Sequence, residues 1–170
     1  NDTMEVTFAL GSKLLLQAQI VSDESEAFTL QKQLIESGHA LEKLLNMIDA
    51  HGGSLSDIAS LHTLHLPTEE GVLSAKKSGI INKMDTLLIG IAHSELGCGR
   101  KKLSDNLDPS AGIEFYHKIG DQVSEGEPLM RLFNSRADNL DRALDLLKKA
   151  VFIDENEINH HLILDDNSNN

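Results

Sequence analysis

The chain has little of what marks secreted or membrane proteins. Cysteine occurs once in 170 residues, at Cys98, so an intrachain disulfide is impossible. No apolar run approaches the roughly 20 residues that a membrane-spanning helix needs. The first residues, Asn1 to Met4, have neither the basic start nor the apolar segment of a signal peptide. These absences exclude a disulfide scaffold and predict a protein with no membrane partner.

Basic residues are also scarce. The 15 Lys and Arg residues face 27 Asp and Glu residues, which gives a formal net charge of −12. Such a charge argues against broad binding to nucleic acids or anionic membranes. We therefore expect an acidic, soluble protein of the cytoplasm with no nucleic-acid partner. The chain also lacks an initiating methionine, which suggests that Asn1 is not its native start.

The first third of the chain reads as helices. Apolar residues at helical spacing predict a helix over residues 4–20. Ser22-Asp23, with Glu26 following, is a capping signal for a second helix that ends at Gly38. A third helix carries the apolar positions of residues 41–48 and ends at Gly52-Gly53. Residues 54–70 show no clean period and read as a boundary.

Beyond this boundary, strands and helices are mixed. We expect strands over residues 71–76, 79–83, 113–119, 129–133 and 158–164. Asp85 is placed to cap a helix that Gly97 closes, and Asn134 or Ser135 to cap one that carries Leu140 to Leu147. The predicted class is α+β: residues 1–66 are helices from the end of an α/β domain, and residues 67–164 a β-rich, barrel-sandwich-like domain with two helices. Residues 165–170 are expected to be a disordered tail.

The glycine-rich basic turn Gly97-Cys98-Gly99-Arg100-Lys101-Lys102 has two interpretations. Glycine amides and basic side chains can cradle a phosphate. However, the turn ends a helix, where carbonyls and the negative end of the dipole are exposed, and it lacks the Walker pattern. A structural connection or interface is the favoured interpretation and an anion site the alternative.

Histidines and carboxylates give no catalytic or metal set. The chain has eight histidines, including His62, His65 and the adjacent His160-His161, but a zinc site needs three or four converging ligands. At Ser104, Asp105 and Asp108, hydrogen bonds in turns and helix caps explain the presence of serine and aspartate as well as a catalytic role would. We assign no catalytic, phosphate-binding or metal residue and no cofactor.

Two family resemblances stand out. The segment Gly120 to Leu129 resembles the turn of biotinyl and lipoyl carrier domains, but no lysine follows it before Lys148. An ordered set of motifs, with Leu10 to Leu15, Ser37 to Lys43 and Ala50 to Gly53 upstream, resembles the C-terminal part of the thymidine phosphorylase and pyrimidine-nucleoside phosphorylase family. The motif residues are Asp85, Ile89, Gly90, Ala92, Leu96, Gly97, Gly99, Arg100, Asp105, Asp108, Ala111, Gly112, Ile113, Lys118, Gly120, Asp121, Val123, Gly126, Glu127, Pro128 and Leu129.

The resemblance implies a pentosyltransferase that splits thymidine, deoxyuridine or uridine with inorganic phosphate, to give base and a pentose 1-phosphate. It implies that substrate-contacting residues lie in an N-terminal half, and the family's T-G-G-T phosphate motif is absent from residues 1–170. The implied partners are that half, on the same or a separate chain, the nucleoside and phosphate, and a second copy in a homodimer. The alternatives are a free-standing, non-catalytic interaction or carrier-like module, or one half of a split phosphorylase.

Overall fold

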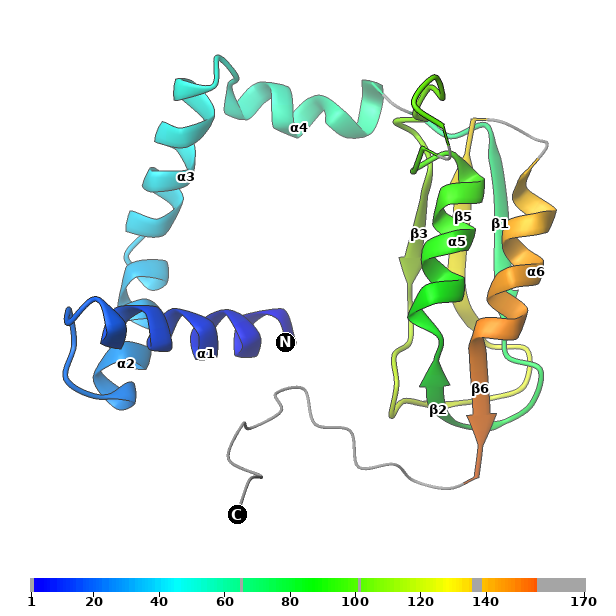
Figure 1. Cartoon of the computed structure of the whole chain (residues 1–170), viewed down its shortest axis with the longest axis horizontal. Helices are drawn as coiled ribbons and strands as arrows, with labels where there is room; N and C mark the ends of the chain where they lie inside the picture. Colours follow the sequence, from blue (N-terminus) through cyan, green and yellow to red (C-terminus); the bar gives the residue numbers. More distant parts are fainter. Residues whose placement is uncertain (1, 65, 101, 136–138, 156–170) are drawn as a thin grey trace. The chain divides into compact units, whose positions relative to one another are not determined.

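The computed structural model describes residues 2–64, 66–100, 102–135 and 139–155 (Figure 1). It divides into two compact units, one built from residues 1–61 and the other from residues 62–160. The sequence places the domain boundary at residues 66 and 67. The predicted last strand at 158–164 and the predicted tail at 165–170 lie outside the described residues.

The first unit is helical. Its elements are α1 (Asp2–Gln17), α2 (Glu24–Glu36), α3 (His39–Ala50) and α4 (Leu55–Leu64), of which α4 runs past the boundary between the units. The capping signal acts as predicted, because the Asp23 carboxylate accepts from the Glu26 amide at 2.8 Å and the Glu26 carboxylate accepts from the Ser22 amide at 2.8 Å. The prediction of three helices is confirmed.

Helices α1 and α2 pack closely through one glycine and one amide. The Gln31 side chain donates to the Ser12 hydroxyl at 2.9 Å and to the Phe8 carbonyl at 3.2 Å. A Cβ atom on Gly11 would lie 1.9 Å from the Gln31 side-chain oxygen, so only glycine leaves room for this contact. The rings of Phe8 and Phe28 meet edge to face at 4.9 Å.

Helix α4 corrects the expectation of an irregular boundary at residues 54–70. Its start is a capping box in which the Ser54 hydroxyl accepts from the Asp57 amide at 3.2 Å. The Asp57 carboxylate in turn accepts from the Ser54 amide at 2.9 Å. The serines that read as loop residues therefore begin a helix.

The second unit combines two sheets and two helices in its described residues. The strands are β1 (Glu69–Ser74), β2 (Gly79–Met84), β3 (Gly112–Phe115), β4 (Gln122–Val123), β5 (Pro128–Asn134) and β6 (Val151–Asp154). They form two antiparallel sheets, with orders β1-β5-β3 and β4-β2-β6. Helices α5 (Thr86–Leu96) and α6 (Leu140–Ala150) pack against each other, and α6 also packs on β1 (Figure 1). The predicted α+β class is confirmed.

The core of this unit lies between the sheets and the two helices. Helix α5 has the predicted ends, since Asp85 accepts from the Leu88 amide at 3.0 Å and Gly97 closes it with φ 104°. The large, fully buried side chains that fill the core come from β2, α5, β5 and α6: Ile81, Leu96, Leu129, Met130, Leu132 and Leu147. Chain segments far apart in the sequence thus share one apolar interior.

Two predicted elements need correction, and one strand, β6, was not predicted. Helix α6 begins after Asn139, because Asn134 is buried in β5 and Ser135 donates both its amide and its hydroxyl to Asp108. Strand β3 ends at Phe115, because the Lys118 amide turns to the Asp121 carboxylate at 2.8 Å. Strand β6 follows α6 without a loop: β-branched Val151 is already extended, with φ −102° and ψ 125°.

Candidate functional site

The glycine-rich turn after α5 is a helix cap. The Gly97 amide donates to the Ser94 carbonyl at 3.2 Å and the Cys98 amide to the His93 carbonyl at 3.2 Å. These amides are the groups that an anion would need, and they already satisfy the end of the helix. The geometry therefore favours a structural connection. Lys101 lies outside the described residues.

Asp108 holds this turn to the end of β5. Its side chain is buried, and its amide donates to the Gly97 carbonyl at 2.9 Å. One carboxylate oxygen accepts from the Ser110 amide at 2.9 Å, and the other accepts from the Ser135 amide and hydroxyl at 2.7 Å each. Burial, and then the charge of Asp108, raise the pKa of the Cys98 thiol. The sequence pattern flagged Asp108, and its position shows a structural anchor.

Ser104 and Asp105 border a hollow beside the same turn. The Asp105 carboxylate accepts from the Lys102 amide at 2.8 Å, which makes it a turn residue. The hollow measures about 500 Å³ and is also lined by Ser94 and Asn139. The buried Glu95 carboxylate nearby lies 3.5 Å from Arg142, so the polar groups link α5 to α6.

The histidines are not gathered into a metal site in the part of the chain that the structure describes. No group of three or more His, Cys, Asp or Glu residues that could hold a metal ion occurs among those residues. The side chains of His62 and His65, and both His160 and His161, lie outside what is described. His117 lies between two carboxylates, with ring nitrogens 3.2 Å from Glu127 and 3.8 Å from Asp121.

The segment that resembles a carrier turn leads into the middle of a sheet. Strand β5 lies between β1 and β3, and its Met130 and Leu132 are fully buried. A carrier domain presents its modified lysine at an accessible hairpin, whereas β5 has no lysine and is paired with a strand on both sides. The geometry therefore speaks against covalent carriage on this segment.

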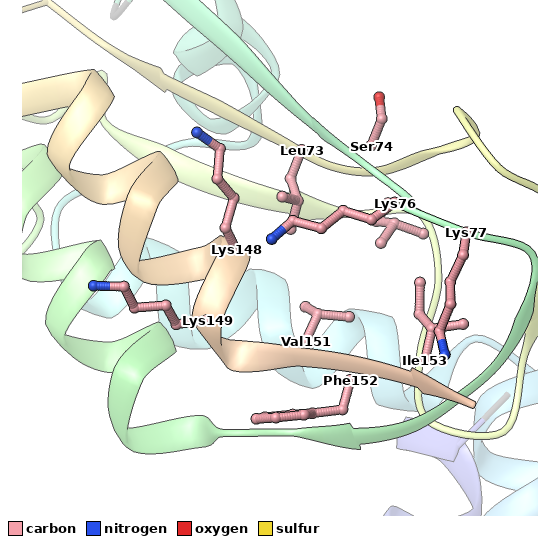
Figure 2. A pocket seen from close by; sticks show the side chains of 10 residues that line it. Leu73, Ser74, Lys76, Lys77, Lys148, Lys149, Val151, Phe152 and Ile153 are labelled. Carbon is pink, nitrogen blue, oxygen red and sulfur yellow. The ribbon is translucent and has the colours of Figure 1, made fainter.

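One further hollow is a groove that sequence reasoning missed. It measures about 590 Å³ and lies in the second unit between β1, the turn that follows it, the end of α6, and β6 (Figure 2). We call it the lysine groove, after the four lysines among its lining residues: Leu73, Ser74, Lys76, Lys77, Leu129, Lys148, Lys149, Val151, Phe152 and Ile153.

Both sides of the lysine groove are held by backbone hydrogen bonds. The turn that carries Lys76 and Lys77 is held at Ala75 by two backbone hydrogen bonds to the turn before β5. The Ala75 amide donates to the Glu127 carbonyl at 2.9 Å, and the Ala75 carbonyl accepts from the Gly126 amide at 2.9 Å. On the opposite side, the Ala150 carbonyl accepts from the Asp85 amide at 2.8 Å. The groove is thus built on fixed elements, and its two lysine pairs lie more than 70 residues apart in the sequence.

The floor and the rim of the groove differ in chemistry. Leu73, Val151 and Ile153 form an apolar surface, and the Phe152 ring is about half exposed with the Lys83 ammonium 5.3 Å from its centre. On the rim, Lys148 is 2.8 Å from the Asp145 carboxylate. A hydrogen bond from Lys148, then the charges of Lys148 and Lys149, lower the pKa of Asp145. Four lysines thus line one groove of a chain whose net charge is −12.

No helix in the described ranges has both the length and the apolar character that would let it cross a bilayer.

Comparisons with known proteins point to one family. Residues 80–154 match the family described as the pyrimidine nucleoside phosphorylase C-terminal domain. A pyrimidine-nucleoside phosphorylase of Staphylococcus haemolyticus (strain JCSC1435) is 32% identical over 152 residues, which cover 89% of this chain and 35% of the relative. For the protein of the same name from Staphylococcus aureus (strain bovine RF122 / ET3-1), the identity is 34% over 164 residues, or 95% of this chain and 37% of the relative.

The chain spans about a third of the length of these curated relatives. The matched residues 80–154 hold α5, both sheets apart from β1, and α6. Since the relatives also align with most of the helical unit, the chain is similar over most of its length to the C-terminal part of pyrimidine-nucleoside phosphorylases.

Proposed function

We propose that the chain acts as the C-terminal portion of a pyrimidine-nucleoside phosphorylase. The complete enzyme would cleave pyrimidine nucleosides with inorganic phosphate, to give base and pentose or deoxypentose 1-phosphate. The observation that carries the proposal is the alignment of 89–95% of the chain with about a third of relatives that bear this name. Inorganic phosphate would be the co-substrate, and no other cofactor is proposed.

The surface of the helical unit supports the idea that it completes a larger domain. Several large apolar side chains on α1, α3 and α4 are more than half exposed: Leu10, Leu14, Leu41, Met47 and Leu55. Helices that expose such residues bury them against further structure in a finished domain. The occupant that we propose is the rest of the α/β domain, whether on the same chain or, in a split enzyme, on a second chain.

The chemistry assigns a supporting role to this portion. Phosphorolysis needs fixed donors around a phosphate dianion and groups that stabilise charge on the departing base. We assign no residue in 1–170 to either task. The second unit would support the active cleft and close it by domain motion in the complete enzyme, which we propose to be a cytoplasmic homodimer.

A chimera tests the proposal. The part of the Staphylococcus aureus relative that precedes the aligned region is fused to residues 1–170, and phosphate-dependent release of thymine or uracil is measured. We expect activity from the chimera and none from residues 1–170 alone. Base release by the 170-residue chain, or a folded and monodisperse chimera without activity, would contradict the proposal.

The intact mass of the native protein in the source cells distinguishes a phosphorylase made of one long chain from one that is split over two chains. A native chain much heavier than 18.6 kDa means that residues 1–170 are part of a longer phosphorylase. A native chain of 18.6 kDa that co-purifies with a phosphorylase N-terminal half means a split enzyme. A native chain of that mass with no such partner would support the non-catalytic module instead.

A further inference from the structure

The lysine groove has the features of a ligand site that the proposed function does not use. Pockets of about 300–1,000 Å³ with apolar walls and a few convergent polar groups are the usual small-molecule sites. This groove, at about 590 Å³, has that size and that lining. Its position on fixed turns and strand ends limits the cost of ordering on binding.

The distribution of lysines is the second observation. Lys148 and Lys149 follow the rule that cations favour the C-terminal end of a helix. Lys76 and Lys77 have no such reason, since they lie on a turn between two strands. Within the described residues no acidic side chain lies within 4.0 Å of the Lys76 or Lys77 ammonium. Figure 2 shows Lys76 extended toward the α6 side of the groove and Lys77 beside Ile153.

We propose that the lysine groove binds a small organic anion, such as a phosphate ester, that carries an aromatic or branched apolar group. The apolar group would lie on Leu73, Val151 and Ile153, and the anionic group would meet the ammonium groups of Lys76, Lys77 and Lys148. In an acidic chain of net charge −12, this cluster provides local attraction for an anion that the molecule as a whole repels. The inference does not rest on the phosphorylase reaction.

A simpler role for the lysines is to protect sheet edges. Strands β1 and β6 both lie at an edge of their sheets, and lysines near an edge discourage pairing with other chains. That role needs neither an apolar floor nor a hollow of this size. The two roles differ in one measurable respect. A ligand site should bind a molecule that has both an apolar and an anionic group more tightly than a molecule with only one of them, whereas lysines that only protect an edge should not.

Three related probes separate the contribution of the apolar group of the ligand from that of its anionic group. They are 1-naphthyl phosphate, which has both groups, 1-naphthol, which has only the apolar group, and inorganic phosphate, which has only the anionic group. The 170-residue chain has no tryptophan and one tyrosine, so naphthyl fluorescence reports binding with little background. Amide shifts in a ¹⁵N-labelled sample locate the bound probe. We expect 1-naphthyl phosphate to bind at least about tenfold more tightly than either other probe, and to shift Leu73 to Lys77 and Val151 to Ile153.

Charge variants complete the test. In Lys76→Glu/Lys77→Glu, we expect the affinity for 1-naphthyl phosphate to fall about tenfold or more. The control Lys13→Glu/Lys43→Glu makes the same change of net charge at exposed positions of α1 and α3, and it should stay within about twofold of the parent chain. Equal losses in both variants, equal affinity for 1-naphthol, or amide shifts confined to residues outside the groove would each overturn the proposal.

Discussion

At the scale of single residues, Asp108 is a buried carboxylate of the second unit that accepts several hydrogen bonds. Its buried carboxylate accepts three short bonds, from the Ser110 amide and from the amide and hydroxyl of Ser135. It therefore joins the end of α5 to the end of β5, two points 38 residues apart in sequence at Leu96 and Asn134. Hydrogen bonds to a buried charge are among the stronger polar interactions in proteins.

Replacement of this carboxylate is expected to be costly. In Asp108→Ala the amides of Ser110 and Ser135 lose their acceptor in a buried region, and we expect the free energy of unfolding to fall by about 3 kcal/mol. Urea unfolding followed by the fluorescence of Tyr116, which lies in the same unit, measures the change. Glu125→Ala removes an exposed turn carboxylate and is the control, with a change below about 0.5 kcal/mol. A similar cost for both variants would show that Asp108 is not an anchor.

At the scale of elements, helix α5 has one glycine inside it and a second one that closes it, and the two differ in whether a side chain would fit. Gly90 lies inside the helix, and a Cβ atom on it would meet nothing within 4 Å. Gly97 closes the helix with φ 104°, and a Cβ atom there would lie 3.0 Å from the Asp108 Cβ. Only the second position needs glycine.

Two alanine variants of this helix should therefore change stability in opposite directions. Gly90→Ala removes backbone entropy from the unfolded chain, and we expect a gain of roughly 0.5–1 kcal/mol. Gly97→Ala forces a left-handed residue with a side chain against Asp108, and we expect a loss of about 1–2 kcal/mol or more. Thermal or urea unfolding of both proteins is the measurement. A loss from both would mean that Gly90 also has a packing role.

A second element-scale feature spans the sheet β1-β5-β3. Arg131 on the central strand donates to Glu70 on β1 at 2.5 and 3.1 Å and to Glu114 on β3 at 3.3 Å. The hydrogen bond from Arg131, opposed only in part by desolvation, lowers the pKa of the Glu70 carboxyl. The bond to Glu70, and then that to Glu114, raise the pKa of Arg131. One cation thus bridges two strands that do not touch each other.

This bridge predicts a stability that depends on pH. Because the pKa of Glu70 is lower in the folded state, its contribution is present above the unfolded value of about 4.3 and is lost as pH falls through the folded value. Arg131→Gln should therefore lower the urea midpoint more at pH 7 than at pH 2.5. The part of the loss that persists at low pH belongs to the contact of Arg131 with the Phe133 ring, 5.0 Å away.

A surface pair in the other unit serves as the comparison. Lys32 lies 3.7 Å from Glu36 within α2. Lys32→Gln should leave the Tyr116-monitored midpoint unchanged at both pH values, since exposed pairs within one helix contribute little. An equal loss for Arg131→Gln at pH 7 and pH 2.5 would exclude an electrostatic role for the bridge.

At the scale of the whole molecule, the two units differ in how complete they are. The second unit encloses a continuous core of fully buried side chains, among them Leu129, Met130 and Leu132. The helical unit has few buried residues, and α3 has none. A unit that exposes its apolar faces in this way is typical of a part that needs further chain to cover it.

We expect the 170-residue chain to show this incompleteness in solution. It should associate at micromolar concentration, since exposed apolar helices attract other copies. Leu14→Lys/Leu41→Lys should reduce association, whereas Lys13→Gln/Lys43→Gln should not. A monodisperse monomer would contradict the proposal that the helices complete a larger domain.

Local physics determined much of this protein from its sequence. Asp23 and Asp85 predict helix starts, Gly38 and Gly97 predict helix ends, and the apolar spacing between them predicts α2 and α5, because caps and periodicity act over a few residues. The ordered motif from Asp85 to Leu129 also identified the family. The start of α4 at Ser54 was not predicted from the sequence. Its partner in the capping box, Asp57, lies in a serine-rich stretch, and such a stretch resembles a loop.

Tertiary structure decided what depends on residues far apart. That Asp108 would accept from Ser135, that Arg131 would lie between Glu70 and Glu114, and that β6 would pair with β2 follow from the arrangement of strands. The lysine groove is the clearest case. In the sequence Lys76 reads as a strand end, Lys77 as a turn residue, and Lys148 and Lys149 as a helix end. Only the packing of α6 on β1 places Lys76 and Lys148 around one apolar floor.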